Sequence, residues 1–113
     1  MTTIQKIQDW EKSFVKKKGI TEDEDKSLKI ATLKLVEEVG EVMKAILENE
    51  WEEVPAELSD VIIFACKIAN IAEQFHNTDK LSDVLSRKID YVETRTYDPK
   101  INKFDKPKNK EFK

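Results

Sequence analysis

Two stretches of the sequence decide the fold. Residues 35–42 read Leu-Val-Glu-Glu-Val-Gly-Glu-Val, and residues 56–66 read Ala-Glu-Leu-Ser-Asp-Val-Ile-Ile-Phe-Ala-Cys. In both stretches the apolar residues include the three- and four-residue intervals of an α-helix. We therefore expect one helix over about residues 22–48 and another from residue 54 or 55 through 75, where Pro55 is tolerated in the first turn.

Two more helices are expected on either side of this pair. Apolar spacing predicts one over residues 3–18, with Gly19 as its C-cap, and one over residues 79–96. Thr21 reads as the N-cap of the second helix, with Glu24 reaching back in a capping box. From residue 98 the chain has two prolines, many lysines and no periodicity. The expected organisation is a helical domain over residues 1–97 and a loose Lys-rich tail over 98–113.

Composition narrows the class of protein further. A chain of 113 residues is the length of one domain, and only 2 Gly and 3 Pro disfavour an all-β fold, which needs frequent turns. The single cysteine, Cys66, excludes an internal disulfide and a Cys-rich zinc site. The longest apolar run, residues 61–66, is too short to span a bilayer. We expect a small all-α protein that is soluble and cytoplasmic, with no membrane partner.

The two central helices are apolar over most of their circumference, which is more than four short helices can bury among themselves. The prediction is a four-helix bundle whose helices are shared in a homodimer or a dimer of dimers. Gly40 lies inside the second helix, where glycine costs about 1 kcal/mol relative to alanine. We expect a helix or a ligand to approach closely there.

Carboxylates interrupt the apolar pattern at matched positions. Glu38 and Glu41 lie one turn apart on the second helix, and Glu57 and Asp60 repeat that spacing on the third. If the two helices pack antiparallel, both pairs meet across one gap and repel unless a cation lies among them. An all-oxygen ligand set suits Mg²⁺ or Mn²⁺ rather than a di-iron centre, which needs histidines. The alternative is a solvated acidic helix face.

The pattern Glu37-Glu38-x-x-Glu41 followed by Glu57-x-x-Asp60 resembles the MazG-like nucleotide pyrophosphohydrolases of the all-α NTP pyrophosphatase superfamily. The resemblance covers about residues 1–97. It implies Mg²⁺-dependent hydrolysis of a (d)NTP to the (d)NMP and diphosphate, in a nucleotide-pool clearing role. It also implies that Glu38, Glu41, Glu57 and Asp60 bind the metal. Glu37 and Glu38 are the expected catalytic residues, with Glu37 contacting a second metal or the attacking water.

The contacts to phosphate and base are expected from scattered residues. Lys88 and Arg95 match phosphate-binding positions in the last helix of the family, although Val92 replaces an Asn between them. Lys34 can reach phosphate or pair with a neighbouring acid. A stacking face for the base, or part of the core, is expected from three aromatic residues: Trp10, Phe14 and Trp51.

Two other functions remain open. One is a dUTP- or phosphoribosyl-ATP-specific member of the same superfamily. The other is a non-catalytic helical module for binding or assembly. The tail contains six lysines but also three acidic residues and lacks an aromatic-rich groove, so the sequence does not favour nucleic-acid binding.

Overall fold

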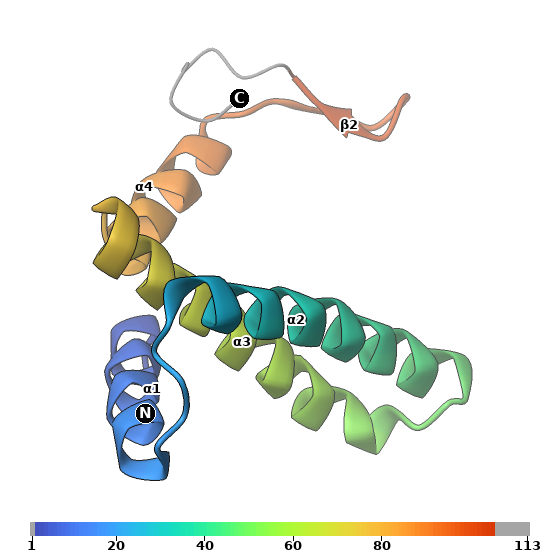
Figure 1. Cartoon of the computed structure of the whole chain (residues 1–113). Helices are drawn as coiled ribbons and strands as arrows, with labels where there is room; N and C mark the ends of the chain where they lie inside the picture. Colours follow the sequence, from blue (N-terminus) through green and yellow to red (C-terminus); the bar gives the residue numbers. More distant parts are fainter. Residues whose placement is uncertain (1, 106–113) are drawn as a thin grey trace. The chain divides into compact units, whose positions relative to one another are not determined.

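The computed structural model describes residues 2–105, and the predicted all-α class is confirmed. The elements are helices α1 (Ile4–Lys18), α2 (Glu24–Leu47), α3 (Val54–His76) and α4 (Leu81–Glu93), a 3₁₀ turn η1 (Trp51–Glu53), and strands β1 (Tyr97–Asp98) and β2 (Lys103–Phe104) (Figure 1). Contacts within the chain divide it into two compact units, residues 1–80 and 81–113. Each unit is described separately below.

In the first unit, α2 and α3 form an antiparallel pair joined by η1, and α1 packs on α3 (Figure 1). The pair is antiparallel because its connection is too short to carry the chain back to a parallel start. Small side chains are among the buried residues of both helices: Ala31 and Ala45 on α2, and Cys66 on α3. This pairing places the middle of α2 opposite the start of α3.

The helix ends follow the local sequence, with two corrections. Gly19 adopts a left-handed backbone (φ 66°) as the C-cap of α1, as predicted. The N-cap of α2 is Asp23 rather than Thr21: the Asp23 carboxylate accepts the Lys26 N–H at 3.0 Å, whereas the Thr21 hydroxyl accepts the Asp23 N–H. The capping-box pattern was therefore two residues out of register. His76, one residue beyond the expected end of the third helix, is the last residue of α3 and pairs with Glu24 at 2.6 Å.

The second unit contains α4 and a short hairpin. β1 and β2 pair antiparallel, with Tyr97 opposite Phe104 and their ring centroids 5.1 Å apart. The sequence predicts a loose tail from residue 98 onward. Two residues per strand are too few to produce an alternating pattern, so the hairpin has no periodic signal. Residues 106–113 of the expected tail lie outside the described residues.

One face of α2 is apolar and exposed. The residues of this face follow one another at alternating spacings of three and four along the helix: Leu33, Val36, Gly40, Met43 and Leu47. We call these five residues the α2 seam. Leu33 and Val36 are each 72% exposed, and Leu47 is 76% exposed. The expected close approach at Gly40 is absent within residues 2–105, because a Cβ added there would meet no atom within 4 Å. Part of the excess apolar surface predicted from the sequence therefore lies on this face; Leu58 and Ile62 of α3 are exposed as well.

Candidate active site

Three carboxylates from α2 and α3 converge. Glu38, Glu57 and Asp60 each place one carboxylate oxygen within 4.8 Å of the others, and we call these three residues the acidic cluster. Glu38 comes from the middle of α2, and the other two come from the first two turns of α3. The antiparallel pairing thus brings together residues about 20 positions apart in the sequence, as the matched i, i+3 spacings predicted.

The cluster is electrostatically unbalanced. Partial burial raises the pKa of Glu38 above its ordinary value of 4.5, and the charges of Asp60, Glu37 and Glu57 raise it further. Lys34 acts in the opposite direction and is the weakest of these influences. Carboxylates in this arrangement favour a bound proton or a cation. The oxygen-only donor set fits a hard divalent ion such as Mg²⁺.

The other two acids of the α2 motif are exposed. Glu41 lies one turn beyond Glu38 and is not one of the three mutually close carboxylates in residues 2–105. Glu37 pairs with Lys34 across a 3.2 Å contact on the surface of α2. Lys34 therefore makes the salt bridge that the sequence analysis offered as the alternative to a phosphate contact.

Two of the three predicted stacking residues lie together. The rings of Trp10 and Phe14 are stacked, with centroids 5.1 Å apart, and Trp10 is 47% exposed. Trp10 also lines a cavity of about 380 Å³ whose wall on α3 includes Ser59, Ile62 and Ile63. Ser59 and Ile63 lie within one turn of Asp60 on that helix. Trp51 is exposed in η1 and does not line this cavity.

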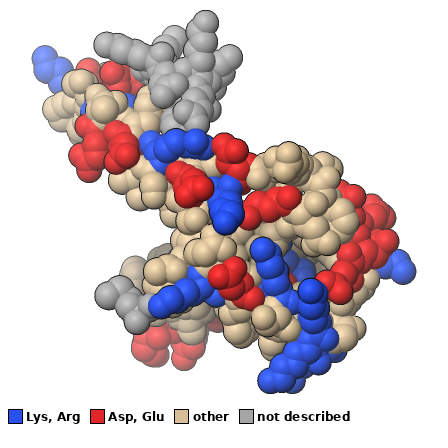
Figure 2. Space-filling model, turned by 90° about the vertical axis from the view of Figure 1, so that its left-hand side faces the viewer, with Lys and Arg blue, Asp and Glu red and all other residues tan. Residues whose placement is uncertain are grey.

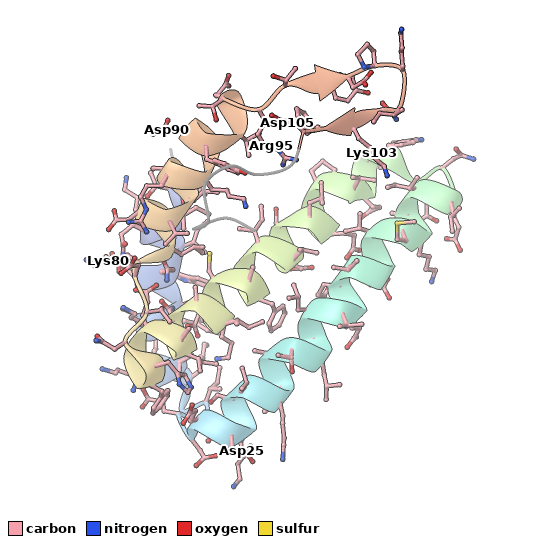
Figure 3. All side chains as sticks on the ribbon, turned by 90° about the horizontal axis from the view of Figure 1, so that it is seen from above. Asp25, Lys80, Asp90, Arg95, Lys103 and Asp105 are labelled. Carbon is pink, nitrogen blue, oxygen red and sulfur yellow. The ribbon has the colours of Figure 1, made fainter. Side chains whose placement is uncertain are left out.

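The predicted phosphate contacts of the last helix belong to the second unit. The Lys88 ammonium lies 5.7 Å from the centroid of the Tyr91 ring. The Arg95 guanidinium donates from Nε and Nη2 to the main-chain oxygen of Asp105, at 3.1 and 2.6 Å, and lies over the Phe104 ring (Figure 3). Arg95 thus anchors the hairpin, a role that the sequence did not reveal.

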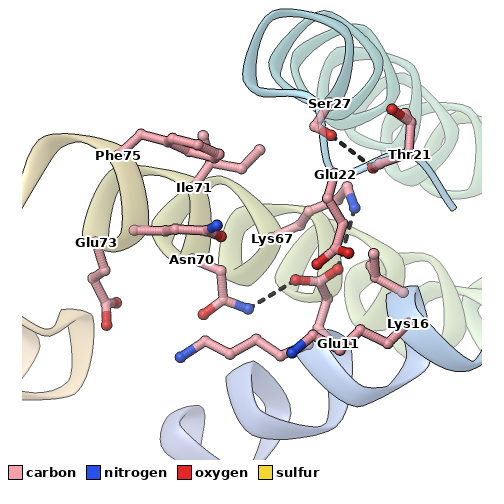
Figure 4. Close-up of a pocket in the computed structure, with 13 residues that line it drawn as sticks. Glu11, Lys16, Thr21, Glu22, Ser27, Lys67, Asn70, Ile71, Glu73 and Phe75 are labelled. Carbon is pink, nitrogen blue, oxygen red and sulfur yellow. Dashed lines mark hydrogen bonds and ion pairs between the residues drawn. The ribbon is translucent and has the colours of Figure 1, made fainter.

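A buried polar cluster between α1 and α3 was also missed. Asn70 and Lys67 point from α3 toward Glu11 on α1, at the base of a cavity of about 390 Å³ (Figure 4). The acid that pairs with Lys67 is thus on another helix, 56 positions away in the sequence. The signal was present in α1, because residues 4, 8, 11 and 15 have helical spacing although two of them are Gln8 and Glu11. Cys66 is 1% exposed and part of the core.

The charged side chains of both signs share the surface. Acidic and basic side chains are interspersed over the face shown in Figure 2. In the part of the chain that the structure describes, no helix combines the length and apolar character needed to cross a membrane.

Comparison with known proteins gives one match. The comparisons with curated proteins and with solved structures found no matching protein and no matching structure. Residues 26–98 match the family model of the MazG nucleotide pyrophosphohydrolase domain, a span that contains all but the first two residues of α2, the whole of α3 and α4, and the acidic cluster. Members of this family are nucleotide pyrophosphohydrolases. Because the match covers more than half of the chain, the chain belongs to the MazG nucleotide pyrophosphohydrolase family.

Proposed function

We propose that this protein is a Mg²⁺-dependent nucleoside triphosphate pyrophosphohydrolase that converts a (d)NTP and water to the (d)NMP and diphosphate. The observation that carries the proposal is the acidic cluster: three carboxylates within 4.8 Å of one another, inside the span that matches the family. A role in clearing the nucleotide pool is part of the same proposal and follows from the resemblance alone.

The residues of the cluster fit a divalent metal ion. Glu38, Glu57 and Asp60 would hold Mg²⁺, with Glu41 one turn along α2 as the fourth carboxylate, and Mn²⁺ suits the same oxygens. The raised pKa of Glu38 agrees with this assignment: its largest cause is burial, followed by the charges of Asp60, Glu37 and Glu57, which Lys34 offsets only in part. When bound, the ion would supply Lewis-acid polarisation of the phosphates and a lower pKa for water.

The chain's own groups would handle the proton and the substrate. In the reaction a water oxygen bonds to the α-phosphorus, and the bond from that phosphorus to the bridging oxygen breaks to release diphosphate. Glu37 is our candidate to accept the proton of the water, because it is exposed beside the cluster and is already oriented by Lys34. Glu38 is assigned as a metal ligand with a catalytic role.

Substrate contacts are assigned to three regions. From the resemblance alone, Lys88 and Arg95 are assigned to outer phosphate oxygens, and Lys34 is a further candidate for such a contact. The Trp10–Phe14 stack, beside a cavity within one turn of Asp60, supports stacking of the base on Trp10.

The test is release of diphosphate from a panel of ribo- and deoxynucleoside triphosphates, with and without Mg²⁺. Glu38→Gln should lose at least about 100-fold in kcat/KM, whereas Glu48→Gln, at the exposed C-cap of α2, should be unaffected. Activity confined to dUTP, or seen only with phosphoribosyl-ATP, would assign the narrower superfamily reactions. No release from any nucleotide would favour a non-catalytic binding module.

We also propose a homodimer formed through the α2 seam. Its support is the 3–4 spacing of exposed apolar residues, the spacing at which helices pack together, and the open space at Gly40 that allows close approach. Val36→Glu should convert the dimer to a monomer by light scattering. Ile101→Glu, at an equally apolar but separate exposed site, should not change the mass. A monomeric wild-type chain would contradict the proposal.

A further inference from the structure

Helix α1 packs onto α3 in an unusual way. Its buried residues are Gln8, Glu11 and Val15, of which Gln8 is 0% and Glu11 6% exposed. The aromatic Trp10 on the same helix is 47% exposed. An amphipathic helix normally buries its largest apolar side chains, so another requirement determines which face of α1 meets α3.

The contact is a network of directional polar interactions. The Asn70 amide donates to Glu11 Oε1 at 2.8 Å and to the Gln8 main-chain oxygen at 3.0 Å. Gln8 Nε2 donates in return to Asn70 Oδ1 at 2.9 Å, and to Glu73 Oε2. Lys67 Nζ lies 3.1 Å from Glu11 Oε2, in an ion pair whose side chains are only 12% and 8% exposed (Figure 4).

Such a network restricts how α1 can sit on α3. Hydrogen bonds depend on angle as well as distance, so buried hydrogen bonds and a buried ion pair are lost when the helix shifts. Gln8 Oε1 has no hydrogen-bond partner among residues 2–105, although it is fully buried. The network therefore stabilises the fold less than a well-packed apolar contact would. It fits the use of buried polar groups to specify one arrangement of α1 on α3.

This arrangement of α1 on α3 also places Trp10 in the wall of the 380 Å³ cavity. Trp10 lies between Gln8 and Glu11 in the sequence, and it faces Ser59 and Ile63 across that cavity. These two residues flank Asp60 of the acidic cluster on α3. The register of α1 on α3 thus sets the distance between Trp10 and the acidic cluster.

We propose that Gln8, Glu11, Lys67 and Asn70 are positioning residues for nucleotide recognition. They hold α1 so that Trp10 meets the base of a nucleotide whose phosphates are at the acidic cluster. This inference rests on the proposed function. None of the four residues is assigned a contact with the substrate, so their loss acts on the placement of Trp10 and leaves the hydrolytic groups in position.

The experiment compares Lys67→Gln and Asn70→Ala with two controls. Both variants should raise KM about tenfold for the preferred nucleotide and keep kcat within about threefold, because a lost base contact weakens binding of substrate and transition state alike. Lys67→Arg should keep the wild-type KM because it retains the cation. Lys29→Gln, which removes an exposed Asp25–Lys29 ion pair whose side chains are 76% and 73% exposed, should also keep it.

A second measurement reports the position of α1 without any nucleotide. In a Trp51→Phe background Trp10 is the remaining tryptophan, and its acrylamide quenching should change in Lys67→Gln and Asn70→Ala but not in Lys67→Arg. If Asn70→Ala fails to fold by circular dichroism, Lys67→Gln, which keeps a hydrogen-bonding side chain, carries the test. Folded variants with wild-type KM and wild-type quenching would overturn the inference, as would an equal loss in kcat and in kcat/KM. Failure of the proposed function is separate, since wild-type protein would then release no diphosphate from any nucleotide.

Discussion

At the scale of single residues, Glu38 is where sequence and environment conflict most clearly. It is half-buried on the α3 side of α2, and three neighbouring carboxylates raise its pKa in addition to the effect of burial. A charged group in this setting destabilises the metal-free fold. We expect that a bound cation offsets this destabilisation. Glu38 is therefore the first residue to substitute in an experiment.

Glu38→Gln should make the metal-free protein more stable near neutral pH. Because the folded-state pKa of Glu38 is raised above 4.5, its favourable contribution is complete below about pH 4.5 and is lost as the pH rises through the raised pKa. The glutamine variant has no such loss. Its melting temperature in EDTA should therefore exceed that of the wild type at about pH 7, and the difference should shrink toward pH 4.5.

Asp25→Asn is the control for that comparison. Asp25 is also on α2 but exposed and paired with Lys29, so its removal should leave melting almost unchanged or slightly lower it. A Glu38→Gln protein that melts below the wild type at neutral pH without metal would contradict the electrostatic account of the cluster.

At the scale of elements, α2 has two faces with different tasks. Glu38 precedes Gly40 by two residues, which places it about 160° around the helix from the α2 seam. The acidic cluster and the exposed apolar face are therefore on opposite sides of one helix. Association through the α2 seam would leave the cluster accessible to a nucleotide from the other side.

Gly40→Ala tests the α2 seam. Within one chain the new methyl group meets no atom, so alanine should stabilise the isolated helix pair by about 1 kcal/mol. In the proposed dimer the same methyl group would separate the two α2 helices. We expect a higher melting temperature of the dilute monomer together with a weaker dimer in sedimentation experiments. A stabilised chain with unchanged self-association would show that Gly40 does not lie in the interface.

The hairpin is anchored by the Arg95 side chain, whereas the main-chain hydrogen bonds of α4 do not involve this side chain. Two guanidinium nitrogens donate to one carbonyl oxygen of Asp105, a fork that a lysine ammonium cannot reproduce. Arg95→Lys should increase amide hydrogen exchange at residues 97–104 and leave α4 protected. Arg87→Lys, at the other arginine of the chain, should leave the exchange of the hairpin as in the wild type. Unchanged exchange in Arg95→Lys would mean that the strand pairing needs no anchor.

At the scale of the whole molecule, a bound divalent ion should stabilise the fold. An ion that binds the folded state and not the unfolded chain adds about 2.7 kcal/mol at a concentration 100 times its dissociation constant. MgCl₂ should therefore raise the melting temperature of the wild type but not of Glu38→Gln. NaCl at matched ionic strength is the control, and an equal shift with NaCl would identify general screening instead of a site.

Local features of the sequence were sufficient for the elements of the fold. Helical spacing of apolar residues, Gly19 and Pro55 predicted where helices run and end to within a few residues, because these signals act over one or two turns. The paired carboxylates predicted the acidic cluster for a related reason. A short connection forces α2 and α3 antiparallel, so equal spacings on the two helices meet.

Contacts between distant residues were decided only by the tertiary structure. Gln8 and Asn70 are 62 positions apart, and nothing in either local sequence indicates that they bond. Glu41 has the same i, i+3 spacing from Glu38 as Asp60 has from Glu57, but it is not in the 4.8 Å group formed by the described carboxylates. The position of a residue on a helix specifies the direction of its side chain and not its distance from the neighbouring helix. The sequence by itself thus determined the helices, their pairing and the type of chemistry. Packing between helices decided which carboxylates converge, which apolar face stays exposed and which polar residues hold α1, since these depend on where whole helices come to rest.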